Sequence, residues 1–294
     1  MAALPLTVGV ELEVCNVSRS CPDRANAHYR GRAVQEIGGW KFKTDASCYD
    51  APGNDPGFAH GHKVGFELVS EVIYTEEGIE TSISEVTSYL NKYGARVNDR
   101  CGMHVHVGVA SFPKADVDRL LSFLVRYEDA FFALADDGRQ SNVYCRRLSE
   151  SLANRVRNGE GVSAWKEGYD ITSNDRYSWL NGVSFSKFGT IEFRIQGGTL
   201  DKDTILGWTN FILHICDSVL NMGGKVFSRK SKSHVPAIAL HDMLQRAGSY
   251  GKLITRCPRR AVLAREWAGA HFKSIHGTSH RAIQKSHAAA RRGV

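Results

Sequence analysis

Two periodicities run along the chain, one of two residues and one of three to four. Residues 6–15 place Val8, Val10, Leu12 and Val14 at every second position, which is typical of a half-buried strand. The same reasoning predicts further strands at 63–73, 101–109, 177–186 and 190–196, the last two forming a hairpin through 187–189. The chain therefore contains enough strands for a substantial sheet.

Helical periodicity appears between these strands. Ile79, Ile83, Val86 and Leu90 recur at spacings of three and four, and Gly94 is placed to end the predicted helix. Further helices are predicted at 115–135 and at 203–220, the latter with Asp201 or Asp203 as N-cap. Residues 16–62 are predicted to be loop-rich with a strand-like patch at 40–43, and residues 136–175 to be irregular.

Charge divides the chain into two parts. The net charge is +7, but residues 225–294 carry fifteen Lys/Arg and two acidic residues, so residues 1–224 are net acidic. We therefore expect a catalytic domain over 1–224 and a basic, helical segment over 225–294. A basic segment favours nucleic acid or another acidic partner, although a solvated surface is the plainer interpretation.

Composition narrows the class of protein. The apolar fraction of 42% is ordinary for a globular domain, and no apolar run is long enough to span a bilayer. The first residues lack the features of a signal peptide, so we expect a cytoplasmic protein without membrane contact. Seven cysteines without a CxxC pair argue against both a disulfide framework and a thiolate zinc site.

The candidate chemistry lies on the polar faces of the strands. Residues two apart in a strand point to the same face, which pairs Glu11 with Glu13, His104 with His106, and Glu192 with Arg194. Glu67, between Phe66 and Leu68, has the same setting. The apolar residues between these groups are expected to pack on helices, which leaves the polar faces to meet in one cleft.

Metal ions are the simplest partners for buried carboxylates, because an unpaired buried charge costs several kcal/mol. Carboxylates supplemented by imidazole suit Mg²⁺ or Mn²⁺ better than Zn²⁺. Each pair alone has an ordinary explanation, such as a cross-strand salt bridge or a core histidine. A zinc hydrolase that uses His104, His106 and a Glu remains an alternative.

The order of motifs resembles that of the putative amidoligase family, within the glutamine synthetase-like carboxylate–amine ligases. The matching segments are GVELE (9–13), KTDASCYD (43–50), GFELVS (65–70), CGMHVHVGV (101–109), GRQSNVYC (138–145), RYSWLN (176–181) and GTIEFRIQGGTLD (189–201). The resemblance covers roughly residues 6–220. One departure is TDAS at Asp45, where the family commonly has TDGS.

The resemblance implies an α+β fold in which a curved antiparallel sheet, covered by helices, forms a catalytic funnel. It also implies ATP and Mg²⁺ (or Mn²⁺) as cofactors, and amide formation through an acyl phosphate. The implied metal ligands are Glu11, Glu13, Glu67, His104, His106 and Glu192.

Four further residues carry implied roles in catalysis or nucleotide binding. Arg194 and Arg176 would face the phosphates, with Glu13 beside the nucleotide, and Arg139 would bind phosphate or carboxylate. Asp45 would be a ligand or the base for the incoming amine, with a turn-forming Asp as the plain interpretation. The chain contains no Walker motif, so ATP binding would depend on the metal face.

The expected partners are a carboxylate and an amine, either of which can belong to a macromolecule, and oligomers are compatible with the family. A non-enzymatic nucleic-acid-binding protein, acting through 225–294, is the second alternative. Its binding would weaken steeply with salt.

Overall fold

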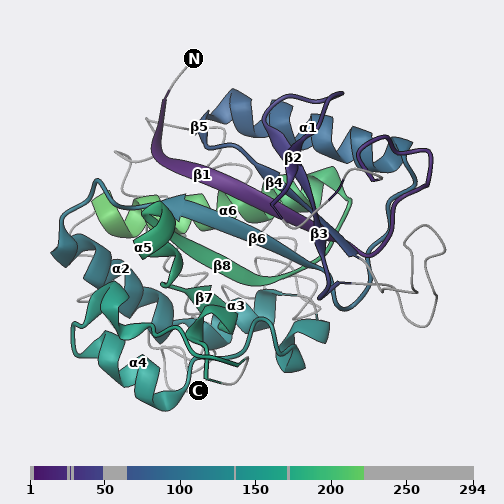
Figure 1. Cartoon of the computed structure of the whole chain (residues 1–294). Coiled ribbons are helices and arrows are strands. Elements are labelled where there is room, and N and C mark those ends of the chain that lie inside the picture. Colours follow the sequence, from purple (N-terminus) through teal and green to yellow (C-terminus); the bar gives the residue numbers. More distant parts are fainter. Residues whose placement is uncertain are drawn as a thin grey trace, which may run out of the picture.

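The computed structural model describes residues 3–24, 27, 30–48, 65–135, 137–170 and 173–221. The predicted basic segment 225–294 lies outside these residues. Within them, eight strands form one antiparallel sheet, in the order β2-β3-β4-β1-β6-β8-β7, with β5 paired to β1 (Figure 1). The strands are β1 (Ala3–Val14), β2 (Arg32–Ala33), β3 (Trp40–Asp45), β4 (Gly65–Ser70), β5 (Ile73–Thr75), β6 (Gly102–Gly108), β7 (Leu180–Asn181) and β8 (Thr190–Gly197).

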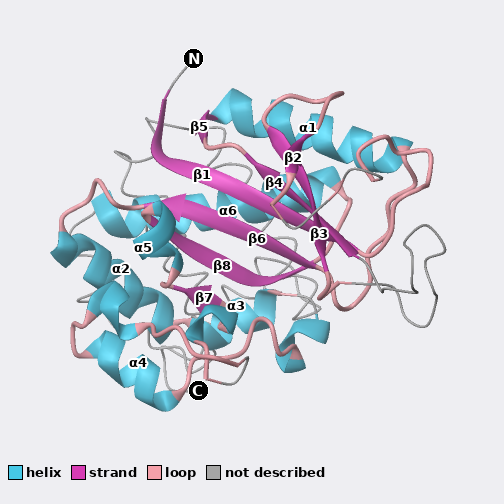
Figure 2. Ribbon diagram, viewed as in Figure 1, coloured by secondary structure: helices cyan, strands magenta, loops and turns pink. Residues whose placement is uncertain are grey.

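Long helices cover one face of the sheet, while the short helix of residues 184–188 lies on the other. The helices are α1 (Glu76–Lys92), α2 (Lys114–Arg126), α3 (Glu128–Leu134), α4 (Glu150–Arg157), α5 (Ser184–Phe188) and α6 (Lys202–Asn221). Helix α6 contacts β1 and β6 as well as α1 and α2, and Figure 2 shows it behind the sheet. The α+β class and the antiparallel sheet are confirmed, while the funnel shape stays a prediction. Among the described helices, none is both long and apolar enough to cross a bilayer.

The core lies between this sheet face and the helices. Val8, Val10, Leu12 and Val14 are each at most 1% exposed, and the alternate residues of β6 and β8 join them in one apolar cluster. Burial of such side chains contributes roughly 1.5–3 kcal/mol each. The other residues of the same strands must point to the opposite face, as the strand period requires.

The predicted helix at 79–90 is confirmed as α1. It begins where Thr75 Oγ1 accepts the N–H of Gly78 at 3.0 Å, and Gly94 beyond it has a positive φ of 59°. Helix α6 begins after Asp201, whose carboxylate accepts the N–H of Thr204 at 2.8 Å. Of the two predicted candidates, Asp201 is therefore the N-cap.

Two predicted elements are each divided in two. The helix predicted at 115–135 is α2 followed by α3, because the backbone leaves helical geometry at Tyr127, with φ −103° and ψ 16°. The strand predicted at 63–73 is β4 followed by β5, with residues 71–72 between them; residues 63–64 lie outside the described part.

The strand predicted at 177–186 is wrong apart from β7. The Ser184 hydroxyl donates either to the carbonyl of Asn181 at 3.0 Å or to that of Thr190 at 2.8 Å. Such local side-chain bonds compete with a strand ladder, and the chain forms the short helix α5 instead. Gly189, with φ 67°, then lets the backbone turn into β8.

The prediction that 136–175 is irregular missed α4. Ser149 caps this helix by accepting the N–H of Leu152 at 3.1 Å, and Leu152, Ala153 and Val156 form its buried side. Eight residues give too short a pattern to distinguish from the surrounding polar loop.

Candidate metal and phosphate site

The polar sheet face carries a cavity of about 350 Å³. It is lined by Glu11 and Glu13 of β1, Lys43 and Asp45 of β3, Glu67 of β4, His104 and His106 of β6, Glu192 and Arg194 of β8, Arg176 and Tyr177 of a 3-10 helix (Asp175–Tyr177), Ser184, Lys187 and Phe188 of α5, and by Ser47, Tyr144, Asn181 and Val183. Eight of the ten strand-borne residues in this lining, all except Lys43 and Asn181, are predicted site residues. Strand parity therefore located the site.

Strand pairing brings the predicted ligands together in rows. Glu11 lies opposite His104, Glu13 opposite Glu67, and His106 opposite Glu192. Opposed side chains in antiparallel strands have Cβ atoms only about 4.5–5.5 Å apart. Groups that are 54 to 93 residues apart in sequence are thus neighbours.

His104 occupies the centre of the carboxylates and is only 2% exposed. Its Nδ1 lies 3.0 Å from Glu11 Oε2 and 3.6 Å from Glu192 Oε1, and its Nε2 lies 3.5 Å from Glu13 Oε1. Glu67 Oε1 lies 3.9 Å from Nδ1. One imidazole is therefore shared by four carboxylates.

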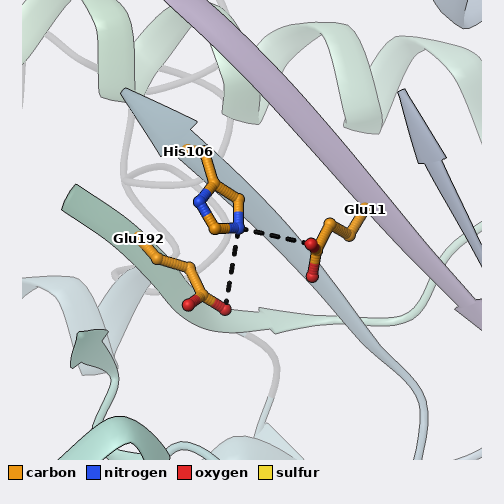
Figure 3. Close-up of side chains that lie close together, drawn as sticks. All are labelled: Glu11, His106 and Glu192. Carbon is orange, nitrogen blue, oxygen red and sulfur yellow. Dashed lines mark ion pairs between the residues drawn. The ribbon is translucent and has the colours of Figure 1, made fainter. Parts of the chain in front are cut away.

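His106 lies between Glu11 and Glu192 (Figure 3). Its Nε2 lies 3.4 Å from Glu11 and 3.9 Å from Glu192, while Nδ1 bonds Thr190 Oγ1 at 3.0 Å. The Nε2 atom is buried and makes no hydrogen bond within the described part of the chain. A ring nitrogen held in this way, with its other nitrogen bonded to a hydroxyl, is arranged as a ligand.

The donor set fits divalent ions. Three groups each have ligand atoms within 4.8 Å of one another, namely Glu11 with His106 and Glu192, Glu11 with Glu67 and His104, and Glu13 with Asp45 and Glu67. Glu11 and Glu67 each belong to two of these groups, so the groups form one continuous set of candidate ligands. Mostly oxygen donors favour Mg²⁺ or Mn²⁺.

The acidic side chains respond to this environment in opposite ways. Burial raises the pKa of Glu13, since the nearby positive groups do not offset its loss of water. Burial also acts to raise the pKa of Glu11, but the hydrogen bond with His104 and the charges of the nearby His104 and His106 outweigh it and hold this pKa well below its ordinary value. An added positive partner would therefore favour the ionised form of Glu13.

Glu192 and Arg194 form a buried pair on β8. The guanidinium bonds Glu192 Oε1, and its Nε donates to the Tyr144 carbonyl at 3.1 Å. Burial acts to raise the pKa of Glu192, but Arg194 and the two histidines lower it. Asn181 Nδ2 donates to the other oxygen, Oε2, at 2.6 Å. Both oxygens of this carboxylate are therefore fixed in place.

The remaining predicted residues differ in position. Arg176 lies exposed at the cavity, with its guanidinium 5.1 Å from the Tyr177 ring centre. Asp45 both lines the cavity and forms a turn, accepting the N–H of Ser47 at 2.7 Å. Its ligand role and its turn role are compatible in this geometry.

Arg139 is not among the residues that line the cavity. Its buried guanidinium donates to the carbonyls of Ile195, Cys101 and Arg194 at 3.0, 3.3 and 2.8 Å. These bonds cross the point where the register of β6 and β8 shifts, between Met103 and Val105. Its geometry is that of a residue that holds the strands in place.

Sequence reasoning missed Lys43 and Asn181. Lys43 forms an ion pair with Glu67, and Asn181 fixes Glu192. Lys43 stands two residues before Asp45, so the parity argument could have found it. No local signal marks Asn181, because its role depends on the pairing of β7 with β8.

Comparison with known protein families gives a match over the part of the chain that contains this cavity. A family model described as "Putative amidoligase enzyme" matches residues 4–216. This range contains the whole cavity lining. No sequence among the curated proteins matches the chain.

Proposed function

Because the chain belongs to the putative amidoligase enzyme family, we propose that it is an ATP- and Mg²⁺-dependent ligase that joins a carboxylate to an amine. The observation that carries this proposal is the meeting of five acidic side chains, two histidines and Arg194 in one cavity. The family supports a ligase-type activity. The nucleotide, the metal and the acyl phosphate are the proposed parts.

The proposed reaction has two steps. An oxygen of the substrate carboxylate attacks the γ-phosphorus of ATP, the bond to the β-phosphate oxygen breaks, and ADP leaves. The amine nitrogen then attacks the carbonyl carbon of the acyl phosphate, phosphate leaves, and the nitrogen loses a proton. The products are an amide, ADP and phosphate.

The side chains of this chain would divide the work by charge. The three carboxylate-rich groups centred on Glu11 and Glu67 would hold Mg²⁺ or Mn²⁺, which neutralises the triphosphate and the transferring phosphoryl group. Arg194, fixed by Glu192 and by the Tyr144 carbonyl, would direct a guanidinium toward the same phosphates. Lys43, Arg176 and Lys187 add positive charge along the cavity wall.

A zinc hydrolase is the second candidate, because both histidines lie beside Glu11, His104 Nδ1 at 3.0 Å and His106 Nε2 at 3.4 Å. It would use one metal with a bound water and no nucleotide. The larger number of oxygen donors favours hard ions instead.

One experiment separates the two candidates. The purified full-length chain is tested for bound metal and for phosphate release from ATP, with panels of carboxylates and amines and with Mg²⁺ or Mn²⁺. The ligase hypothesis expects phosphate release that requires both substrates. Stoichiometric bound zinc, together with ATP left intact under every condition, would replace it by the hydrolase.

A further inference from the structure

A second cavity, of about 570 Å³, adjoins the metal and phosphate site. We call it the neutral cavity. It shares Glu11, His106 and Phe188 with the first cavity and extends toward the loops that follow β4 and β6. Its volume is in the range of small-molecule sites. A ligand within it can therefore reach the predicted metal ligands directly.

Beyond Glu11 and His106, the floor of the neutral cavity is the same sheet face with uncharged residues. Thr7 and Gly9 continue the row of Glu11 along β1, and Gly108 continues the row of His106 along β6. A Cβ added to Gly9 would meet its nearest neighbours at 3.7 Å and 3.9 Å, which is ordinary contact. The space above Gly9 is therefore open because glycine has no side chain. A large side chain at this position would fill it.

The walls are apolar and open. Val72 is 53% exposed and Phe188 is 69% exposed, and both line the neutral cavity. Exposed apolar side chains at the wall of a cavity favour binding of the uncharged, apolar part of a ligand, because both surfaces are then removed from water. The neutral cavity thus suits the body of a substrate better than its charged end.

The two cavities differ in whether cations accompany their acids. Among the described residues that line it, the neutral cavity has the carboxylates of Glu11 and Glu71 and no Lys or Arg. The first cavity has Lys43, Arg176, Lys187 and Arg194 together with five carboxylates. Anionic groups, such as a triphosphate or a substrate carboxylate, are favoured where the cations are, and a cationic group is favoured where acids have no Lys or Arg beside them.

We propose that the neutral cavity binds the amine substrate, and that it selects amines with an uncharged, apolar body and no carboxylate. The nitrogen would lie beside Glu11 and His106, and the body against Val72 and Phe188. This inference rests on the proposed ligase function and specifies its amine. A free carboxylate on the body would find no Lys or Arg among the described residues that line the cavity.

A matched set of three compounds tests the selection. Phenethylamine, phenylalanine and 3-phenylpropionate share one aromatic body and differ only in carrying an ammonium, both charges, or a carboxylate. Binding to the full-length protein with Mg²⁺ is measured by calorimetric titration. We expect phenethylamine to bind at least about tenfold more tightly than either of the other two.

Variants locate the binding. Gly9→Leu fills the floor, and Val72→Arg places a cation at an exposed wall, so each should weaken phenethylamine binding at least about tenfold. Val143→Arg is the matched control, because Val143 is 51% exposed and lines neither cavity. It should leave binding unchanged. Since Val72 is exposed, its variant keeps the test valid if Gly9→Leu does not fold.

Three results would overturn the inference: 3-phenylpropionate binding as tightly as phenethylamine, no saturable binding of phenethylamine, or displacement of phenethylamine by adenosine. The last would assign the neutral cavity to the nucleoside of ATP. None of these titrations requires ATP turnover. Failure of the ligase hypothesis would instead appear as intact ATP while phenethylamine still binds.

Discussion

Glu13 on β1 and Glu67 on β4 lie directly opposite each other in the sheet, and both carboxylates are buried. Like charges at directly opposed positions destabilise a pair of strands. Lys43 pairs with Glu67, and His104 Nε2 lies 3.5 Å from Glu13, so the two acids have different partners. A divalent cation beside Glu13, Asp45 and Glu67 would stabilise this arrangement, which is why the apo and metal-bound proteins should respond differently to substitution.

Glu13→Gln and Glu11→Gln should have opposite effects on the metal-free protein. The pKa of Glu13 is raised above its ordinary 4.5, so the stability that its neutral form contributes is lost as pH rises through the folded value. A neutral Gln should therefore raise the free energy of unfolding at pH 7, by about 0.2–1 kcal/mol. The pKa of Glu11 is lowered, so its ionised form contributes stability above 4.5, and Glu11→Gln should reduce stability at pH 7.

Denaturation with urea in the presence of a chelator measures both effects, and Mn²⁺ titration measures the metal. Each variant should lose Mn²⁺ affinity by about tenfold or more, and Glu11→Gln should abolish ATP turnover. Equal Mn²⁺ affinity in both variants and the parent protein would remove these two residues from the ligand set.

Asn181 should act through Glu192. Asn181→Ala removes the 2.6 Å bond to Glu192 Oε2, which frees that carboxylate to rotate. Partners of metal ligands typically account for about 10–100-fold in affinity, so Mn²⁺ binding should weaken by about tenfold. Asn154→Ala, on α4, is a matched control outside both cavities. Unchanged Mn²⁺ binding in Asn181→Ala would show that Arg194 alone fixes Glu192.

Substitution of Arg194 should affect catalysis, whereas substitution of Arg139 should affect stability. Arg194 lines the cavity, so Arg194→Lys should lower ATP turnover by about 100-fold or more with a small change in stability. Arg139→Met leaves three carbonyls without their donor, and should lower the free energy of unfolding by about 3 kcal/mol or more. If Arg139→Met unfolded at the parent urea concentration yet lost turnover, Arg139 would belong with the phosphate-binding residues.

The thiol of Cys101 should make the fold sensitive to alkali. Cys15 acts to lower the pKa of this thiol, but its bond with Cys48 and its burial prevail and raise the pKa to about 12. The unfolded thiol ionises near the ordinary 9.0, so the stability held by the neutral form is present below 9.0 and lost between 9.0 and about 12.

Within that window this thiol should contribute a loss of about 1.4 kcal/mol per pH unit, and Cys101→Ala should remove that part of the slope. Urea denaturation at several pH values measures it. The parent and the variant should show the same pH dependence between pH 6 and pH 8, which serves as the internal control. Identical slopes above pH 9 would contradict the assignment.

Local pattern predicted much of the fold because strand and helix periods are properties of neighbouring residues. The α1 and α6 helices, β1 and β6 follow from spacing alone, and so does the division of each strand into an apolar and a polar side. The errors lie where local bonds compete. Ser184 ends a predicted strand by bonding nearby carbonyls, and Tyr127 divides a predicted helix.

The Glu/His spacing by itself determined which side chains share a face, since a backbone that alternates leaves no other choice. It did not determine which strands are neighbours or in what register they pair. Only the tertiary structure placed Glu13 opposite Glu67 and His106 opposite Glu192, and gave the Arg139 guanidinium three main-chain carbonyls. These relationships depend on how the apolar faces pack against α1, α2 and α6, which is a property of the whole core and not of any one segment.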